Sequence, residues 1–108
     1  VWTEVQKLQA SDGGSGERFG YSMVIEGDAL VVGAPRALID GVETGAAYVF
    51  RREPGGWSEV AKLVPTDGEE DDKFGEHVAL RGGQLLVSSP GYNGQGNAMG
   101  AAYLFSAP

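Results

Sequence analysis

The stretch GAAYVF at residues 45–50 returns 55 residues later as GAAYLF at residues 100–105. The agreement extends outward from this stretch, because aligning residues 2–53 with residues 57–108 gives 19 identical pairs without a gap. A fixed period of this size is typical of repeat architectures, in which one unit cannot bury its hydrophobic face alone and stacks on its neighbours. Two units are fewer than such architectures usually need, so the function depends on what supplies the missing neighbours.

Each repeat reads as four short strands. The segments are rich in Val, Leu, Tyr and Phe and are bounded by Gly, Asp or Pro, which favours strands. None of them carries a sustained helical period. We therefore predict an all-β protein with eight strands, at residues 2–8, 19–25, 29–34 and 46–51 of the first repeat and 57–63, 74–80, 84–89 and 101–106 of the second.

The third strand of the first repeat, ALVVGA at residues 29–34, is apolar on both faces, and such a strand is covered on both sides. A four-stranded antiparallel sheet stacked between two similar sheets meets this condition, which is the arrangement of a β-propeller blade. Small residues such as Gly33 and Ala46 would let neighbouring sheets approach closely. We predict that the recurring aromatic residues fill the wider gaps between blades: Trp2, Trp57, Tyr48, Tyr103, Phe50 and Phe105.

The connections alternate between short turns and loops of about 10 residues. In an antiparallel meander alternate connections lie at the same end, so we expect all the long loops on one face. These loops also differ most between the repeats, and recognition usually resides in such loops on a rigid scaffold. The sequence therefore offers four candidate ligand-binding residues in the loops that follow the third strands: Arg36, Asp40, Tyr92 and Asn93.

The first repeat contains FG at residues 19–20 and GAP at residues 33–35, with a Trp strand ahead and GAAYVF behind. This order of motifs resembles the FG-GAP repeat, the blade unit of the integrin α-subunit propeller. The second repeat keeps FG at residues 74–75 but has SSP at residues 88–90. The pattern also resembles repeats of long bacterial secreted and surface proteins, which implies an extracellular or cell-surface parent protein.

Many integrin-type repeats carry a Ca²⁺ loop of alternating Asp between these two strands. Here the connections at residues 26–28 and 81–83 are too short to supply six to eight oxygen ligands, so this metal site is not carried over. The acidic run at residues 67–72 is the remaining metal candidate, but a solvated loop is the simpler interpretation. We therefore expect no metal or cofactor, and the residues that a metal would use here are Asp67, Glu69, Asp71 and Asp72.

The sequence shows no motif of nucleophilic catalysis, phosphate binding or zinc binding. His77 is the single histidine, and Glu76 beside it would point to the opposite face of a strand. The chain has no Cys, and its net charge of −7 comes without a basic patch. This charge argues against nucleic acid and anionic membranes as partners.

We therefore interpret the chain as a non-enzymatic propeller fragment of two four-stranded blades that serves as a scaffold or binds a ligand such as a protein or a glycan. The alternative is a hydrolase or lyase whose site lies in a central channel shared between chains. Since Val1 is not an initiator Met, we expect the chain to have been cut from a longer protein, processed, or assembled by design.

The partner that we expect for the unpaired blade faces is the chain itself. The strand at residues 2–8 would complete the last blade of a neighbouring copy, because residues 57–63 follow the first repeat in the same way. Head-to-tail contacts of this kind repeat around an axis until they close. A trimer would have six blades and a tetramer eight, with a slight preference for eight.

Overall fold

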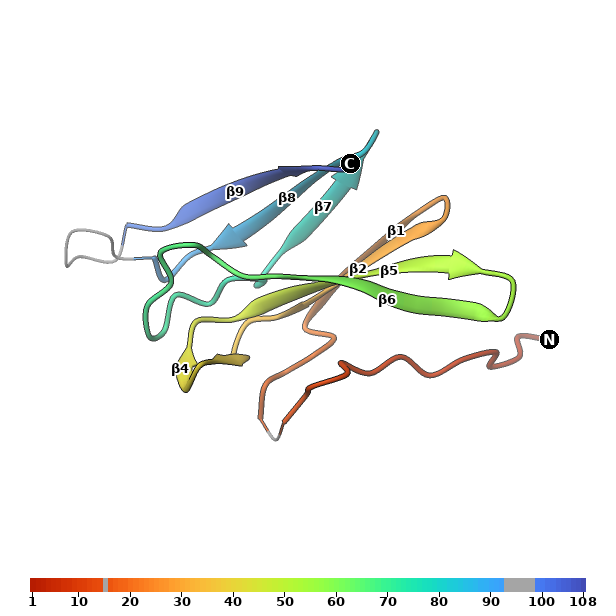
Figure 1. Ribbon diagram of the computed structural model, residues 1–108, viewed down its shortest axis with the longest axis horizontal. Coiled ribbons are helices and arrows are strands. Elements are labelled where there is room, and N and C mark those ends of the chain that lie inside the picture. The colour runs from red at the N-terminus through yellow and green to blue at the C-terminus, as the bar shows by residue number, and fades with distance from the viewer. Residues whose placement is uncertain (15, 93–98) are drawn as a thin grey trace.

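The computed structural model describes residues 1–14, 16–92 and 99–108. Within these ranges it contains strands and no helix, and so nothing with the length and apolarity of a membrane-spanning helix. The prediction of an all-β protein is confirmed. The strands are β1 (Ser22–Glu26), β2 (Ala29–Ala34), β3 (Leu38–Ile39), β4 (Val42–Glu43), β5 (Ala46–Glu53), β6 (Gly56–Leu63), β7 (Val78–Arg81), β8 (Gln84–Ser89) and β9 (Ala101–Ser106) (Figure 1).

The first sheet contains four antiparallel strands in the order β1-β2-β5-β6. Its last strand, β6, holds Trp57 opposite Arg52 and Leu63 opposite Ala47, with a register shift between Val49 and Phe50. The Trp strand that opens the second repeat is therefore the outer strand of the first repeat's sheet. For residues 2–8, a place in the blade of a neighbouring copy stays a prediction.

The second sheet contains three antiparallel strands in the order β7-β8-β9. It repeats the register of the first sheet, because Val87 pairs with Tyr103 as Val32 pairs with Tyr48. The strand that would correspond to β6 is missing among the described residues. As a result, one edge of β9 is left without a neighbouring strand.

Residues 2–8, predicted as a strand, form no strand in the structure. A strand needs the backbone of a neighbouring strand to satisfy its N–H and C=O groups, and among the described residues no strand pairs with residues 2–8. Trp2 is fully exposed, so its predicted packing between blades is also wrong for the single chain. The Gln6 side chain instead bonds the backbone of Trp57, donating to its carbonyl and accepting from its N–H at 2.9 Å each.

Two further differences concern where strands begin and how many there are. The second strand of each repeat begins later than predicted, at Ser22 and Val78, because the FG pairs form turns in which Gly20 and Gly75 each have φ of +96°. The connection at residues 35–44 was expected to be an irregular loop but contains the hairpin β3–β4. The predicted count of eight strands is therefore wrong, since nine occur in the described ranges.

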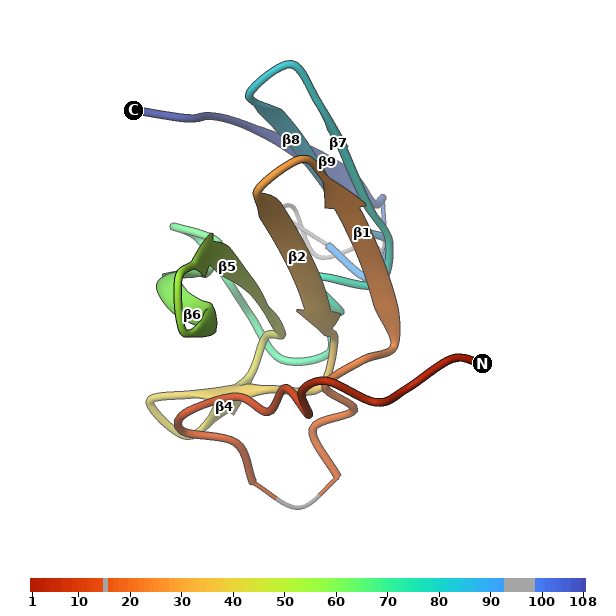
Figure 2. The ribbon, with the colours of Figure 1, turned by 90° about the vertical axis from the view of Figure 1, so that its right-hand side faces the viewer.

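Both faces of β2 are covered, as its sequence indicates. Val31 and Val32 point to opposite faces and are each 1% exposed. Val31 belongs to the core between the sheets, with Ala47, Phe74, Leu85 and Val87. Figure 2 shows the two sheets lying face to face. Val32 belongs to a second core on the outer side of the first sheet, with Ala34, Ala37, Ala46, Tyr48 and Phe50, and Leu8, Ala10 and Phe19 pack against it.

The sheets approach closely where small residues meet. A Cβ added to Gly33 would overlap the carbonyl oxygen of Gly75, and one added to Gly45 would overlap the carbonyl oxygen of Phe74. Phe74 is fully buried and makes edge-to-face contacts with Tyr103 and Phe105, at ring-centroid distances of 5.3 and 6.2 Å. Two stacked antiparallel sheets with this packing are consistent with a fragment of a β-propeller.

Candidate functional site

The connections at residues 35–44 and 64–73 lie together at one end of the sheets, opposite the turns that join β1 to β2 and β7 to β8 (Figure 1). They are joined by hydrogen bonds across the two repeats. The N–H of Asp71 donates to the carbonyl of Glu43 at 3.0 Å, and the N–H of Glu43 donates to Glu70 Oε1 at 3.0 Å. We call residues 35–44 and 64–73 together with Tyr92 the long-loop end, and it presents loops of both repeats.

Arg36 and Asp40 both lie on this end, in different settings. The Arg36 guanidinium forms an ion pair with Glu43 at 3.0 Å, and its side chain is 39% exposed. Asp40 has φ of +53° and Gly41 has φ of +84°, which is the conformation of a two-residue hairpin turn between β3 and β4. Arg36 is thus held at the surface, whereas the position of Asp40 is explained by the turn that it forms.

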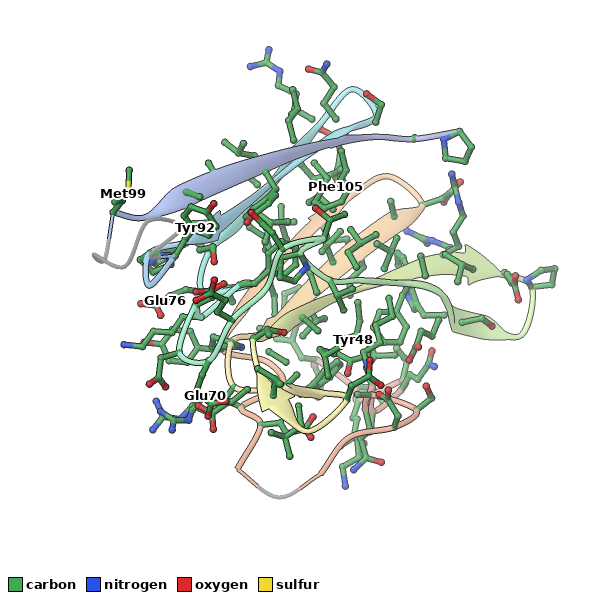
Figure 3. The ribbon with its side chains drawn as sticks, turned by 60° about the vertical axis from the view of Figure 1, so that its left-hand side comes forward. Tyr48, Glu70, Glu76, Tyr92, Met99 and Phe105 are labelled. Atoms are coloured by element: carbon green, nitrogen blue, oxygen red, sulfur yellow. The ribbon has the colours of Figure 1, made fainter. Side chains whose placement is uncertain are left out.

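Tyr92 lies near Asp67, and Asn93 lies outside the described residues. The carbonyl of Tyr92 accepts hydrogen bonds from the N–H groups of Met99 and Gly100, each at 2.8 Å. The hydroxyl groups of Tyr103 and Tyr92 lower the pKa of Asp67, and Asp67 in turn raises the pKa of Tyr92. Figure 3 shows Tyr92 on the same side of the molecule as Glu70. Tyr92, Tyr103 and Asp67 therefore form one polar site, in which both tyrosine hydroxyls act on the Asp67 carboxylate.

The acidic run at residues 67–72 is ordered by contacts within the protein. Tyr103 donates its hydroxyl to Asp67 Oδ1 at 3.0 Å, and the N–H of Glu69 donates to Asp72 Oδ2 at 2.8 Å. Asp72 is fully buried, whereas Asp67, Glu69 and Asp71 are exposed. In the part of the chain that the structure describes, no three His, Asp or Glu side chains are grouped as metal ligands would be.

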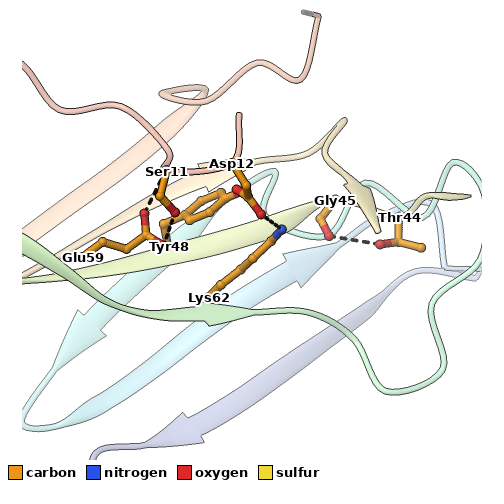
Figure 4. A network of polar contacts seen from close by, with 7 residues as sticks. All are labelled: Ser11, Asp12, Thr44, Gly45, Tyr48, Glu59 and Lys62. Carbon is orange, nitrogen blue, oxygen red and sulfur yellow. Dashed lines mark hydrogen bonds and ion pairs between the residues drawn. The ribbon is translucent and has the colours of Figure 1, made fainter. Parts of the chain in front are cut away.

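Sequence reasoning missed a polar network that closes the outer edge of the first sheet (Figure 4). Asp12 Oδ1 accepts a hydrogen bond from the Tyr48 hydroxyl at 2.9 Å, and Asp12 Oδ2 forms an ion pair with Lys62 on β6. Glu59, also on β6, accepts from the N–H and the hydroxyl of Ser11 at 3.1 Å each. The signal was present, because these residues have identical or similar counterparts one period away.

The electrostatics of this network follow from its contacts. Lys62 and then the Tyr48 hydroxyl lower the pKa of Asp12. Burial, followed by the hydrogen bond to Asp12, raises the pKa of Tyr48. Tyr103 has a raised pKa for the corresponding reasons, burial and its bond to Asp67. The tyrosine–aspartate pair is thus built twice, and among the described residues a lysine contacts the aspartate in the first copy only.

His77 and Glu76 lie in the turn before β7. His77 is exposed, and its N–H donates to Ser88 Oγ at 3.0 Å. The N–H of Glu76 donates to the carbonyl of Lys73 at 3.1 Å. These hydrogen bonds, one to a side chain and one to the backbone, hold the turn, so the two residues do not lie on a strand as predicted.

Comparison with known protein families gives one match. The model of the FG-GAP repeat matches residues 2–50 and residues 57–105. The two matches coincide with the two sequence repeats and together cover most of the chain. No match is found among curated proteins.

Proposed function

Because this chain belongs to the FG-GAP repeat family, we propose that it is a non-enzymatic β-propeller module for binding or scaffolding, with its ligand surface at the long-loop end. The observation that carries the proposal is the contrast between strands and loops. The strands of the two repeats share sequence and register, whereas RALID at residues 36–40 corresponds to a different sequence, GYNGQ, at residues 91–95. Variable loops on a repeated scaffold are the usual place for recognition.

The loops supply polar groups that suit protein or glycan ligands. The Arg36 guanidinium and the partly exposed Tyr92 ring offer hydrogen bonding and stacking at one end of the molecule. Hydrogen bonds between Glu43 and the neighbouring loop tie the two repeats together there. A ligand at this end would therefore meet a preorganised surface, which lowers the entropic cost of binding.

The test is binding to arrays of glycans and of extracellular proteins, with loop variants and matched controls. We expect Arg36→Ala and Tyr92→Ala to lose binding to whichever array component the wild-type chain captures. Gln84→Ala, at the opposite end of the sheets, is the control and should bind normally. Equal binding by all three variants would exclude the long-loop end as the ligand surface.

We further propose that the chain associates with itself into a closed ring. Leu86 and Leu104 on the outer face of the second sheet are 46% and 63% exposed. Their counterparts Val31 and Val49 lie in the interface between the two sheets. An apolar sheet face of this kind is rarely left open in a soluble monomer. Light scattering at tens of micromolar should give a molar mass of three or four chains.

The competing function, a hydrolase or lyase with a shared central site, is tested on the same material. We expect fractions that contain the associated chain to show neither hydrolysis nor lyase-type elimination when they are assayed with panels of glycans and esters. Turnover that follows the associated fractions and is lost in the monomer would favour the enzymatic alternative over a binding module.

A further inference from the structure

A site lies open beside the outer edge of β9, which has no paired strand among the residues that the structure describes. A cavity of about 620 Å³ lies between the two sheets at this edge. Val31 and Val49 of the first sheet line it on one side, and Leu85, Phe105 and Ala107 of the second repeat line it on the other. The site thus combines an unpaired strand edge with an apolar opening, the two features that strand addition uses.

The first sheet shows what fills the corresponding site. There β6 pairs with β5, and Trp57 packs against the core that contains Tyr48 and Phe50, with the Arg52 guanidinium 5.1 Å from its ring centroid. Two charged side chains of β6 then fix the strand. Lys62 pairs with Asp12, and Glu59 accepts two hydrogen bonds from Ser11.

The second sheet contains the residues that would bind such a strand, which correspond to Tyr48, Asp12 and Ser11 of the first sheet. Tyr103 donates to Asp67 at 3.0 Å, just as Tyr48 donates to Asp12 at 2.9 Å. Thr66 occupies the position of Ser11 and also carries a hydroxyl group. In the described ranges no strand corresponding to β6 lies at this edge, and Asp67 is exposed.

The strand that would complete the site has its sequence at the start of the same chain. Five of its residues are identical to the corresponding residues of β6, namely Trp2, Glu4, Val5, Lys7 and Leu8. Trp2 is fully exposed, and Val5 is 91% exposed. Within its own chain this segment lies by the first sheet, where Gln6 contacts Trp57 and Leu8 joins the outer core.

We propose that residues 2–8 of a second copy pair with β9 as a fourth strand, with Lys7 binding Asp67, Glu4 binding Thr66 and Trp2 entering the cavity. In the two repeats β9 corresponds to β5, and residues 2–8 correspond to β6, each at a distance of 55 residues. If the new pair keeps the register of β5 and β6, Leu8 lies opposite Ala102, Lys7 opposite Tyr103 and Trp2 opposite Ala107. Ala107 lines the cavity, so the register brings the indole ring to its opening. This inference rests on the proposed self-association and specifies its contacts.

Reciprocal charge exchange tests the pairing in full-length chains. Lys7→Glu places two negative charges at each junction, and Asp67→Lys places two positive charges there, so each variant alone should associate at least tenfold more weakly than wild type. Mixing them in equal amounts should restore association. In alternating copies, Glu at position 7 meets Lys at position 67, and the other junction keeps the original Lys7–Asp67 pair. A ring of four copies can alternate completely, whereas three copies can alternate only as an open assembly, so restored association is any rise in molar mass above that of the separate variants. Weight-average molar mass by light scattering is the readout.

Matched controls separate this inference from the broader proposal. Lys73→Glu makes the same charge change at an exposed loop position and should associate like wild type, whereas Trp2→Ala should associate more weakly. If wild type associates and both charge variants still associate alone, the strand pairing is wrong but self-association stands. The pairing is also overturned if each variant is monomeric and the mixture stays monomeric. A monomeric wild type at tens of micromolar would overturn both proposals.

Discussion

At the scale of single residues, Gly33 sets the distance between the two sheets. Its φ lies outside the left-handed region, so the glycine is required by close approach and not by backbone conformation. A methyl group here would overlap the carbonyl oxygen of Gly75 and the hydroxyl of Ser22, whose Oγ donates to that same carbonyl at 2.9 Å. The contact leaves no room for adjustment without moving backbone.

We expect Gly33→Ala to lower the free energy of unfolding by about 1–3 kcal/mol, as overpacking does. Gly55→Ala is the matched control, because a Cβ at Gly55 meets no atom within 4 Å, and its effect should stay within about 0.5 kcal/mol. Urea unfolding of both variants measures the difference. Equal stability of the two would mean that the sheets are less closely packed at Gly33 than the structure shows.

Asp12 should make stability depend on acid pH. In the unfolded chain Asp12 has its ordinary pKa of 3.8, and in the folded chain Lys62 and Tyr48 lower that pKa. The contribution of Asp12 to stability is therefore present above about pH 4 and is lost as the pH falls through the lower, folded pKa. Because the pair is partly exposed, the contribution is modest.

The measurement is urea unfolding between pH 2 and pH 6 for wild type and Asp12→Asn. The stability of wild type should fall more steeply with decreasing pH below about pH 4, and the two curves should converge at the acid end. Parallel curves over the whole range would contradict the assigned role of Asp12.

At the scale of elements, the two Trp-containing segments, residues 2–8 and 57–63, share a sequence pattern but differ in structure. Trp57 lies on β6, packs against the outer core and is contacted by Arg52. Trp2 lies on a segment without a strand partner and is fully exposed. The difference follows from the neighbour that each segment finds, since β2 occupies one edge of β5 and residues 56–63 occupy the other.

We expect Trp57→Ala to lower the free energy of unfolding by about 2–3 kcal/mol. The loss is smaller than the roughly 3–5 kcal/mol of a fully buried aromatic residue, because Trp57 is partly exposed. Trp2→Ala should leave the stability of the single chain unchanged within about 0.5 kcal/mol. Thermal unfolding at low protein concentration, where association is suppressed, makes the comparison. A large loss for Trp2→Ala under these conditions would show that residues 2–8 already pair within their own chain.

At the scale of the whole molecule, the two faces of the second sheet differ in exposure. The inner face packs on the first sheet, whereas Leu86 and Leu104 of the outer face are exposed. Ser88 occupies the position that Gly33 has in the first sheet. A sheet that docks on this outer face therefore sits farther away at that point, so contact between copies should be weaker than contact within the chain.

We expect Leu104→Glu to abolish self-association without unfolding the chain, because the side chain is 63% exposed and its replacement removes no buried contact. Leu38→Glu, at 52% exposure in the hairpin β3–β4, makes the same change away from the sheet face and should associate normally. Sedimentation and circular dichroism together separate loss of association from loss of fold. Normal association of Leu104→Glu would show that the outer face is not the contact surface.

Much of the fold could be read from local pattern. The strands β2, β5, β6, β8 and β9 fall where the sequence predicts them, because alternation, bounding turn residues and the repeat act within a few residues of each position. The family could be recognised for the same reason, since its motifs are short and stand in a fixed order. By contrast, two-residue strands such as β3 carry no readable period, although Asp40-Gly41 is a hairpin signal.

The remaining features depend on contacts between distant parts of the chain. Asp12, Tyr48 and Lys62 come from three separate segments, so their network exists only once the first sheet has formed. Residues 2–8 and 56–63 share a pattern, yet one is a strand and the other is not, because hydrogen bonding in a sheet requires a partner that local sequence cannot provide. Local preference specifies which residues can form a strand, and the neighbouring backbone settles which of them do.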